Sequence, residues 1–307
     1  MIDLTKLQSF LQVAQEMSFS AAATHLNLSQ PTISHHIKML ERDLGVELFE
    51  RTGNNLRLTE AGALLLPRAR KLMRDVVEIE QMLESTEEKI VGSLRIACST
   101  TTGKYILPQF AARFHAKHPG VTVSILRCTA AHVVPQLLKE DADLGVVSFD
   151  ACGSGMECQE FFNDHIVLIV PASHPWAKRD YVDPSDLLET QVISREAMSG
   201  TRHAVLAELG KHGIVPDDMD IFLEVSNAEA IVKTVEAGFG VSFVSRLAAL
   251  WALEQGTVVE TPVTGFDLHR KVYLVRPEIY KANRAVDAFW GFVHDPANSD
   301  LLRMAEK

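Results

Sequence analysis

Residues 18–62 read SFSAAATHLNLSQPTISHHIKMLERDLGVELFERTGNNLRLTEAG, and this stretch decides how the start of the chain folds. It predicts two short helices that meet across a four-residue turn, followed by a basic hairpin. A winged helix-turn-helix needs this order to place its second helix in the major groove of DNA. We therefore expect residues 1–58 to form a sequence-specific DNA-binding domain.

The helix expected over residues 30–44 is the one that would enter the groove. Ser29 is a natural N-cap, and Pro31 in the first turn sacrifices no hydrogen bond. One face should be buried, because apolar residues recur on it: Ile33, Ile37, Leu40 and Leu44. The other face carries side chains that can read base edges or hold phosphates: Gln30, Thr32, Ser34, His35 and Lys38.

A wing is expected after this helix. Residues 46–51 and 55–58 predict two short strands, and Gly53-Asn54 supplies the turn between them. Arg51 and Arg57 are then positioned to reach phosphates or the minor groove. The predicted DNA-binding residues are Ser29, Gln30, Pro31, Thr32, Ser34, His35, Lys38, Arg51 and Arg57.

In the alternative interpretation, the polar face of this helix is merely exposed to solvent and does not bind DNA. The cap, the turn, the buried row and the wing occur together and in order, which favours DNA reading. A metal site at His35-His36 is not expected, because adjacent histidines on a helix point in different directions.

Composition and charge bound the function further. The 307 residues suit two or three domains, and the contents of 47% hydrophobic and 23% charged residues are typical of a folded protein. The net charge is −10, yet residues 1–74 contain nine basic and seven acidic residues. The N-terminal segment is thus basic, whereas the rest of the chain is acidic. This distribution fits DNA binding by the N-terminal domain better than nucleic-acid binding over the whole protein surface.

No targeting or membrane segment is expected. The N-terminus has no basic region leading into an apolar run, and no stretch approaches about 18 apolar residues. A cytoplasmic protein is therefore expected, with its cysteines reduced. The four cysteines form no CxxC pair, so a metal site is not predicted.

Six runs within the opening stretch resemble the head of LysR-type transcriptional regulators: FSAAA at 19–23, LSQPTIS at 28–34, LE at 40–41, LGV at 44–46, LFER at 48–51 and LTEAG at 58–62. His35-His36 departs from the Arg, Lys or Gln that members more often carry there. The resemblance extends over the whole chain. It implies a homodimer or homotetramer that binds an inverted repeat in double-stranded DNA, responds to an effector and contacts RNA polymerase.

Residues 59–89 predict a dimerising linker helix capped by Thr59. Apolar residues step by four and three along it, as in a short heptad seam: Leu65, Ala69, Leu72, Val76, Ile79 and Leu83. The alternative is a helix that packs on its own domain. Pro67 is expected to kink this helix or to unwind its first turns.

Residues 90–307 alternate apolar strands with helices, which predicts an α/β effector-binding domain with parallel strands. Two subdomains are expected, one over about 92–163 and 268–296 and the other over about 164–267. Such a pair encloses a cleft that suits a small ligand. This part resembles the effector domain of the LysR type, which is itself similar to periplasmic binding proteins.

Polar groups that come after the expected strands predict the ligand site, because open α/β sheets bind ligands at the carboxyl ends of their strands. Two helix starts are rich in donors, one at Ser99-Thr100-Thr101 and one at Thr201-Arg202, and both suit an anion. The predicted effector-binding residues are Ser99, Thr100, Thr101, Thr129, Ser148, Phe149, Thr201 and Arg202. The alternative for each hydroxyl is a helix cap, and for Asn227 a cap is the preferred interpretation.

Other functions compete with that of a ligand-responsive transcriptional regulator. Cys152 and Cys158 flank a glycine-rich loop, and their pairing would make a redox sensor. An enzyme is disfavoured, because no GxSxG, HExxH, P-loop or complete GxGxxG motif is present. The predicted DNA-binding domain argues against a solute-binding protein that serves transport. The SGTR run at 199–202 resembles the LysR-type regulators that control genes for carbon fixation or for sulfur and nitrogen assimilation. Ligands in that branch are often small anions, so we expect a small anionic effector. No cofactor is expected.

Overall fold

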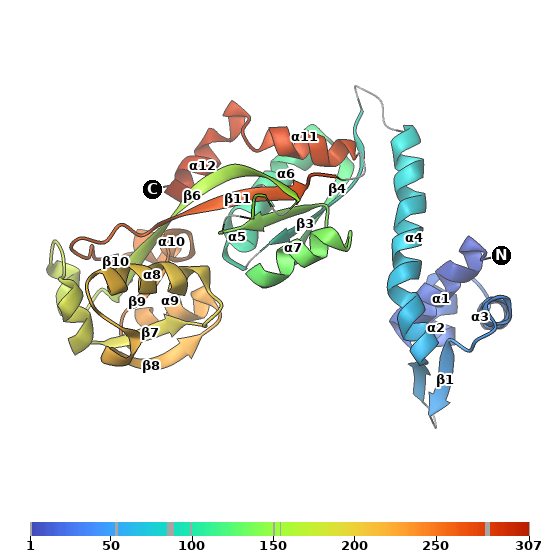
Figure 1. Ribbon diagram of the computed structural model, residues 1–307, viewed down its shortest axis with the longest axis horizontal. Coiled ribbons are helices and arrows are strands. Elements are labelled where there is room, and N and C mark those ends of the chain that lie inside the picture. Colours follow the sequence, from blue (N-terminus) through green and yellow to red (C-terminus); the bar gives the residue numbers. More distant parts are fainter. Residues whose placement is uncertain are drawn as a thin grey trace. The chain divides into compact units, whose positions relative to one another are not determined.

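The structure is a computed structural model that describes residues 2–52, 55–84, 89–98, 100–149, 151–153, 155–279 and 283–306. It divides into two compact units, Met1–Glu84 and Ser85–Lys307 (Figure 1). Each unit has hydrophobic cores of its own. The long helix expected as a separate linker belongs to the first unit.

The first unit is a winged helix-turn-helix followed by one long helix. Its elements are α1 (Leu4–Glu16), α2 (Phe19–His25), α3 (Gln30–Leu44), β1 (Phe49–Thr52), β2 (Asn55–Leu58) and α4 (Glu60–Glu84). The Ser18 and Ser29 hydroxyls cap α2 and α3 by accepting hydrogen bonds from backbone N–H groups. Gly45 ends α3 in the left-handed region, at φ 73°. The bounds of α3 are those predicted.

The wing is held to the helices on both sides of it. The Glu41 carboxylate accepts the N–H of Leu48 at 2.8 Å, and strand β1 begins one residue later, at Phe49. On the other side, the Thr59 hydroxyl donates to the carbonyl of Glu47 at 2.6 Å. Gly62 is required there, since a Cβ on it would lie 2.1 Å from the carbonyl oxygen of Leu48.

Helix α4 changes character along its length. It runs without interruption through Pro67, so of the two effects expected of this proline the unwinding of the first turns is wrong, whereas a kink stays a prediction. Ala69 is buried and Leu65 packs on the core of the head, as in the alternative interpretation. Further along, Leu72, Ile79 and Leu83 are 41%, 55% and 78% exposed. Only the second half of the predicted seam is therefore open to a partner.

The second unit contains two α/β subdomains. Subdomain I is built from β3 (Val91–Cys98), β4 (Gly120–Arg127), β5 (Leu144–Val147), the first half of β6 (Met156–Pro171), β11 (His269–Pro277), α5 (Thr100–Tyr105), α6 (Leu107–Lys117), α7 (Ala130–Leu138), α11 (Arg284–Phe292), η4 (Pro296–Asn298) and α12 (Ser299–Glu306). Strand β3 pairs in parallel with β4 and β5, and helices cover a core that includes Phe110, Phe114 and Phe289.

Subdomain II is built around the second half of β6. Its other elements are η1 (Pro175–Lys178), η2 (Pro184–Glu189), β7 (Gln191–Arg195), α8 (Gly200–Lys211), η3 (Pro216–Asp218), β8 (Asp220–Val225), α9 (Ala228–Glu236), β9 (Ser242–Ser245), α10 (Arg246–Glu254) and β10 (Val258–Glu260). Strands β7 and β8 are parallel, whereas β9 and β10 run antiparallel to β6.

The chain passes between the subdomains along β6 and β11, which pair antiparallel (Figure 1). The sheets are therefore mixed, and the expected parallel pairing holds for β3 with β4 and β5 and for β7 with β8. A strand that leaves a subdomain and one that returns to it must run in opposite directions. Strand β6 begins at Met156, and polar residues interrupt the apolar pattern over its first ten residues.

Candidate functional site

Helix α3 presents most of the predicted DNA-binding side chains to solvent. Gln30, Pro31, His35 and Lys38 are exposed, and Ser34 is half-buried. Gln30, Ser34, His35 and Lys38 make no side-chain hydrogen bond or ion pair with any described residue. Their donors and acceptors are thus available to an external partner, while the opposite face, with Ile33 and Ile37, is buried in the head.

Three other residues of this region, Ser29, Thr32 and His36, are engaged in the fold. The Ser29 hydroxyl accepts the N–H of Thr32 at 3.2 Å and lies 2.7 Å from the Thr32 hydroxyl, so both belong to the helix cap. His36 turns inward, and its Nδ1 lies 2.7 Å from the hydroxyl of Ser9 on α1. His35 and His36 therefore differ in role, one exposed and the other anchoring α3 to α1.

The wing contributes one described basic side chain. Arg57 is exposed on β2 opposite Glu50 of β1. Arg51 lies on β1, but its side chain is outside the described part of the structure, as are Gly53 and Asn54.

A cavity of about 590 Å³ lies where subdomains I and II meet. It is lined by Arg127, Cys128, Thr129, Ala130, Ser148, Arg195, Glu196, Met198, Ser199, Gly200, Ser226, Asn227 and Arg270. Of the predicted effector-binding residues, Thr129 and Ser148 line it. Its polar character and its size suit a small metabolite.

Three helix N-termini open onto this cavity, those of α7, α8 and α9. Thr129 precedes α7, Ser199 caps α8 by accepting the N–H of Arg202, and Asn227 caps α9. Asn227 is the cap that the sequence predicted. Backbone N–H groups at helix starts attract negative charge, so their convergence favours an anion.

Gly200 brings groups from different parts of the unit together at the start of α8. A Cβ on this residue would lie 2.8 Å from the hydroxyl oxygen of Ser148 and 3.1 Å from Nη1 of Arg270. Glycine is therefore what allows a hydroxyl of subdomain I and a guanidinium of β11 to approach the helix. A larger residue would push both groups away.

Three arginines line the cavity, and they differ in what holds them. Arg195 binds Glu196 through two hydrogen bonds of 2.9 and 3.0 Å. Arg270 pairs through Nε and Nη2 with the buried Asp164, at 2.7 and 2.6 Å. Arg127, exposed at the end of β4, makes no hydrogen bond or ion pair with any described residue. Arg127 is thus the cation most available to a ligand.

Thr201, Arg202 and Phe149 lie elsewhere than expected. The Arg202 guanidinium binds Glu224 at 2.5 Å and the carbonyl of Arg195 at 2.9 Å, so it faces β8 and β7 and does not line the cavity. Thr201 is 1% exposed and borders a separate cavity of about 30 Å³. Phe149 is 41% exposed and does not line the cavity either.

The predicted Ser99-Thr100-Thr101 site lies largely outside the described part. Ser99 is not described, and Thr100 and Thr101 are described only as the backbone of α5. These three residues therefore stay a prediction.

The sequence interpretation missed Arg127, Arg195 and Arg270. A usable signal was present for the first two, since Arg127 is the last residue of β4 and Arg195 the last of β7. The predicted site residues lie just beyond the strands, whereas these two arginines are the final residues of the strands themselves. Arg270 carries no such signal, because its place depends on Asp164, more than 100 residues earlier.

The four cysteines, all in the described part, form no disulfide. Burial raises the pKa of the Cys98 thiol to about 12 and also raises the pKa of Cys128, which lines the cavity. Both thiols are therefore poor nucleophiles at neutral pH. Cys152 is exposed and Cys158 half-buried, and a redox role for that pair stays a prediction.

Two further observations on the described residues bear on other classes of function. No group of three or more His, Cys, Asp or Glu is placed there to hold a metal ion. None of the helices seen there has both the length and the apolar character to cross a membrane.

Comparison with known proteins gives matches over both units. Residues 4–63 match the profile of the bacterial regulatory helix-turn-helix protein, lysR family, and residues 87–297 match the LysR substrate binding domain. The RuBisCO operon transcriptional regulator of Allochromatium vinosum is 32% identical over 298 residues, covering 95% of each chain.

Two solved structures share the fold. CbnR in complex with its target DNA superposes with a TM-score of 0.75 at 24% identity, covering 95% of this chain and 99% of that one. The regulatory domain of Synechocystis CcmR in complex with 2-PG has a TM-score of 0.59 at 24% identity, covering 70% of this chain and 98% of that one.

Proposed function

The chain belongs to the LysR family of transcriptional regulators, and on that premise we propose that it reads its operator with α3 and responds to a small anion held between its subdomains. The main support for an anionic ligand is Arg127, which lies beside the starts of α7, α8 and α9. Its guanidinium has no partner among the described residues. Guanidinium groups and helix N-termini both bind carboxylates, sulfate and phosphate.

The anion would be held by groups from both subdomains. Arg127, Thr129 and Ser148 come from subdomain I, whereas Ser199 and Gly200 come from subdomain II. A ligand that touches both sides binds best when they approach each other, so it shifts the population toward that arrangement. That shift is the signal we propose for the rest of the molecule.

Glu196 and Asp164 make the site selective without making it acidic. Each is already paired with an arginine of the cavity, so each orients its guanidinium while cancelling its charge. The cavity then offers about one uncompensated cation, that of Arg127, and a set of neutral donors. This balance favours a compact anion with one or two charges.

Assembly can be inferred from the exposed half of α4. Leu72, Ile79 and Leu83 share one helix face and lack a partner of their own in the described part of the chain. We propose that this face pairs with a second copy in a homodimer, that dimers associate into a homotetramer, and that paired heads bind an inverted repeat. We further propose a cytoplasmic regulator that contacts RNA polymerase and turns over no metabolite.

Calorimetry on two arginine variants tests the ligand site. The probes are 2-PG, inorganic phosphate, sulfate and small dicarboxylates, with 2-PG included because the CcmR regulatory domain holds it. Arg127→Ala should weaken binding of the preferred anion roughly tenfold or more, the value of a lost charge-assisted hydrogen bond. Arg202→Ala is the matched comparison and should have little effect, because that side chain is engaged with Glu224. The reverse order of effects would contradict this site.

A further inference from the structure

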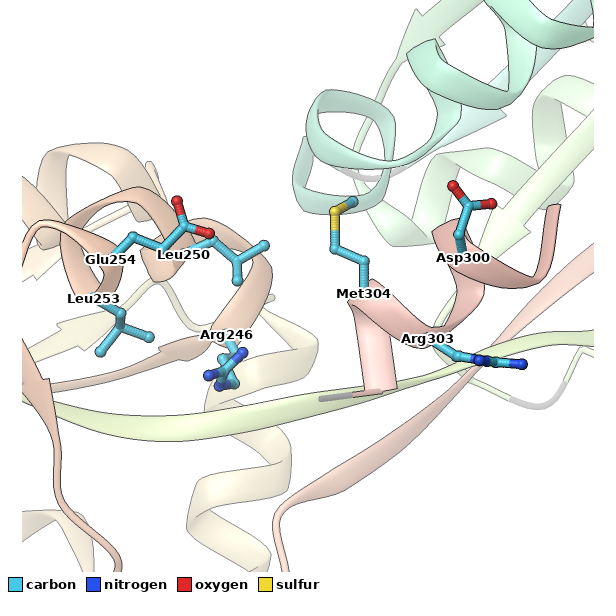
Figure 2. A pocket seen from close by; sticks show the side chains of 7 residues that line it. All are labelled: Arg246, Leu250, Leu253, Glu254, Asp300, Arg303 and Met304. Atoms are coloured by element: carbon cyan, nitrogen blue, oxygen red, sulfur yellow. The ribbon is translucent and has the colours of Figure 1, made fainter.

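A second cavity, of about 560 Å³, lies between α10 and α12. Arg246, Leu250, Leu253 and Glu254 line it from α10, and Asp300, Arg303 and Met304 line it from α12 (Figure 2). It shares no lining residue with the cavity proposed for the anion. A ligand here would be distinct from that anion.

The two helices give this cavity contact with both subdomains. Helix α10 packs on each core, since Leu247 belongs to the core of subdomain I and Ala252 to the core of subdomain II. Helix α12 packs on subdomain I through Leu301. A molecule bound between α10 and α12 would therefore touch the junction of the subdomains.

The lining combines apolar surface with one oriented cation. Leu250, Leu253 and Met304 are half-buried and leave apolar surface between the helices. Arg246 donates from Nε to Glu260 at 2.9 Å, which orients the guanidinium. Its two terminal Nη groups make no hydrogen bond with any described residue, so they are free to bind an anionic group.

The acidic groups nearby do not block such an anion. Asp300 is bound by Arg113 through two hydrogen bonds of 2.7 and 2.6 Å, and this pairing lowers the pKa of Asp300 to about 2. Glu260 is occupied by Arg246 itself. Glu254 of α10 and Arg303 of α12 also line the cavity; both are exposed, and their charges are opposite.

We propose that the cavity between α10 and α12 is a second small-molecule site, which takes an amphipathic organic anion. Its carboxylate or similar head binds the Nη groups of Arg246, and its hydrocarbon part lies on Leu250, Leu253 and Met304. An apolar body with one directed charge is what this lining complements.

The methionines give a direct readout of which cavity is occupied. Met304 lines this cavity and Met198 lines the other, so methyl-¹³C-methionine NMR of the full chain reports on each separately. Sodium octanoate is the probe, and octanol, with the same hydrocarbon part and no charge, is its control. Octanoate should shift the Met304 methyl and leave Met198 unmoved, and octanol should bind at least several-fold more weakly.

Variants of Arg246 test the head group. Arg246→Lys keeps the charge but loses the two Nη donors, and it should raise the Kd of octanoate roughly tenfold. Arg246→Gln should do so at least as strongly. Trp251→Ala is the control, because Trp251 is exposed on the same helix and does not line the cavity.

Three results would overturn this site. They are an octanoate shift at Met198 without one at Met304, no shift at either methyl, or unchanged affinity in both Arg246 variants. Because Arg127 is not part of this cavity, Arg127→Ala should leave the octanoate response intact. Failure of the anion site in the cleft and failure of this one are thus separable.

Discussion

The carboxylate of Glu229 on α9 accepts a hydrogen bond from the hydroxyl of Tyr105 on α5 at 3.0 Å, so one contact joins subdomain II to subdomain I. Lys104, next to Tyr105, forms an ion pair with the same carboxylate. Asn227, two residues before Glu229, lines the proposed anion cavity. The contact therefore lies beside the cavity and favours the arrangement in which its two sides are close.

Removing this contact should weaken the binding of the anion. Glu229→Gln loses the ion pair with Lys104, and Tyr105→Phe loses the hydrogen bond. A partly exposed pair contributes up to about 1 kcal/mol, so calorimetry should show a loss in affinity of up to about fivefold. Glu236→Gln is the matched control on the same helix, because Glu236 binds Lys233 and Thr257 within subdomain II. Equal effects of the two Glu→Gln variants would contradict a role across the cleft.

The same contact predicts a pH dependence with a definite sign. The hydrogen bond from Lys104, followed by that from Tyr105, lowers the pKa of Glu229 below its ordinary value. A lowered pKa in the folded state stabilises the fold above the ordinary pKa, and this stabilisation is lost as the pH falls through the lowered value. The difference in unfolding free energy between the parent and Glu229→Gln should therefore be present at pH 7 and shrink toward pH 4. A difference that grows on acidification would exclude this account.

Substitutions on α3 should separate base reading from phosphate binding. Gln30→Ala or Ser34→Ala should cost about 1–3 kcal/mol at the cognate site and little at other sequences. Lys38→Ala should weaken binding to all sequences and lower the slope of log K against log salt by about one. Fluorescence anisotropy with cognate and scrambled duplexes measures both. Unchanged cognate affinity for the Gln30 and Ser34 variants would place the readout elsewhere.

The adjacent histidines of α3 should behave differently. His36→Ala removes the hydrogen bond to the buried Ser9 and should lower the unfolding free energy of the head by about 1 kcal/mol. His35→Ala, at an exposed position without a partner in the described part, should leave stability unchanged and affect only DNA binding. Thermal unfolding of the two variants is the measurement. Equal stability losses would show that the contact between α3 and α1 does not depend on His36.

Charges on the exposed face of α4 should break the proposed dimer. Leu72→Glu with Ile79→Glu should reduce binding to an operator with two half-sites toward that of one half-site. Val77→Glu is the control, because Val77 is also exposed but lies on nearly the opposite face of the helix. Analytical ultracentrifugation reports the assembly, and circular dichroism reports the folding of the head. A double variant that stays dimeric would remove this face from the interface.

Local signals in the sequence predicted α3, the helix that we propose reads the operator. Ser29 predicted where α3 begins, because the chemistry of a helix cap is contained in neighbouring residues; at the other end, Gly45 adopts the left-handed region. Thr129 and Ser148, which both come after a strand, were predicted for a similar reason, and both line the cavity; a role in binding the effector stays a prediction.

Local signals could not predict contacts between side chains that lie far apart in the sequence. The start of α8 was predicted, yet the direction of Arg202 depends on Glu224 of β8. In the same way, Arg270 reaches the cavity because Asp164 on the neighbouring crossing strand holds it. Sequence patterns place backbone elements well, but the pairing of charges between elements needs the tertiary structure.

The most direct test of the central claim is an affinity measurement on the full chain with its own operator, with and without the anion that binds the cleft. Genomic fragments enriched by the purified protein supply the operator, and calorimetry supplies the anion. The anion should change the operator affinity or footprint of the parent, whereas Arg127→Ala should bind the operator normally but no longer respond at that anion concentration. An unaltered response in Arg127→Ala, or no preference for any genomic sequence, would contradict it.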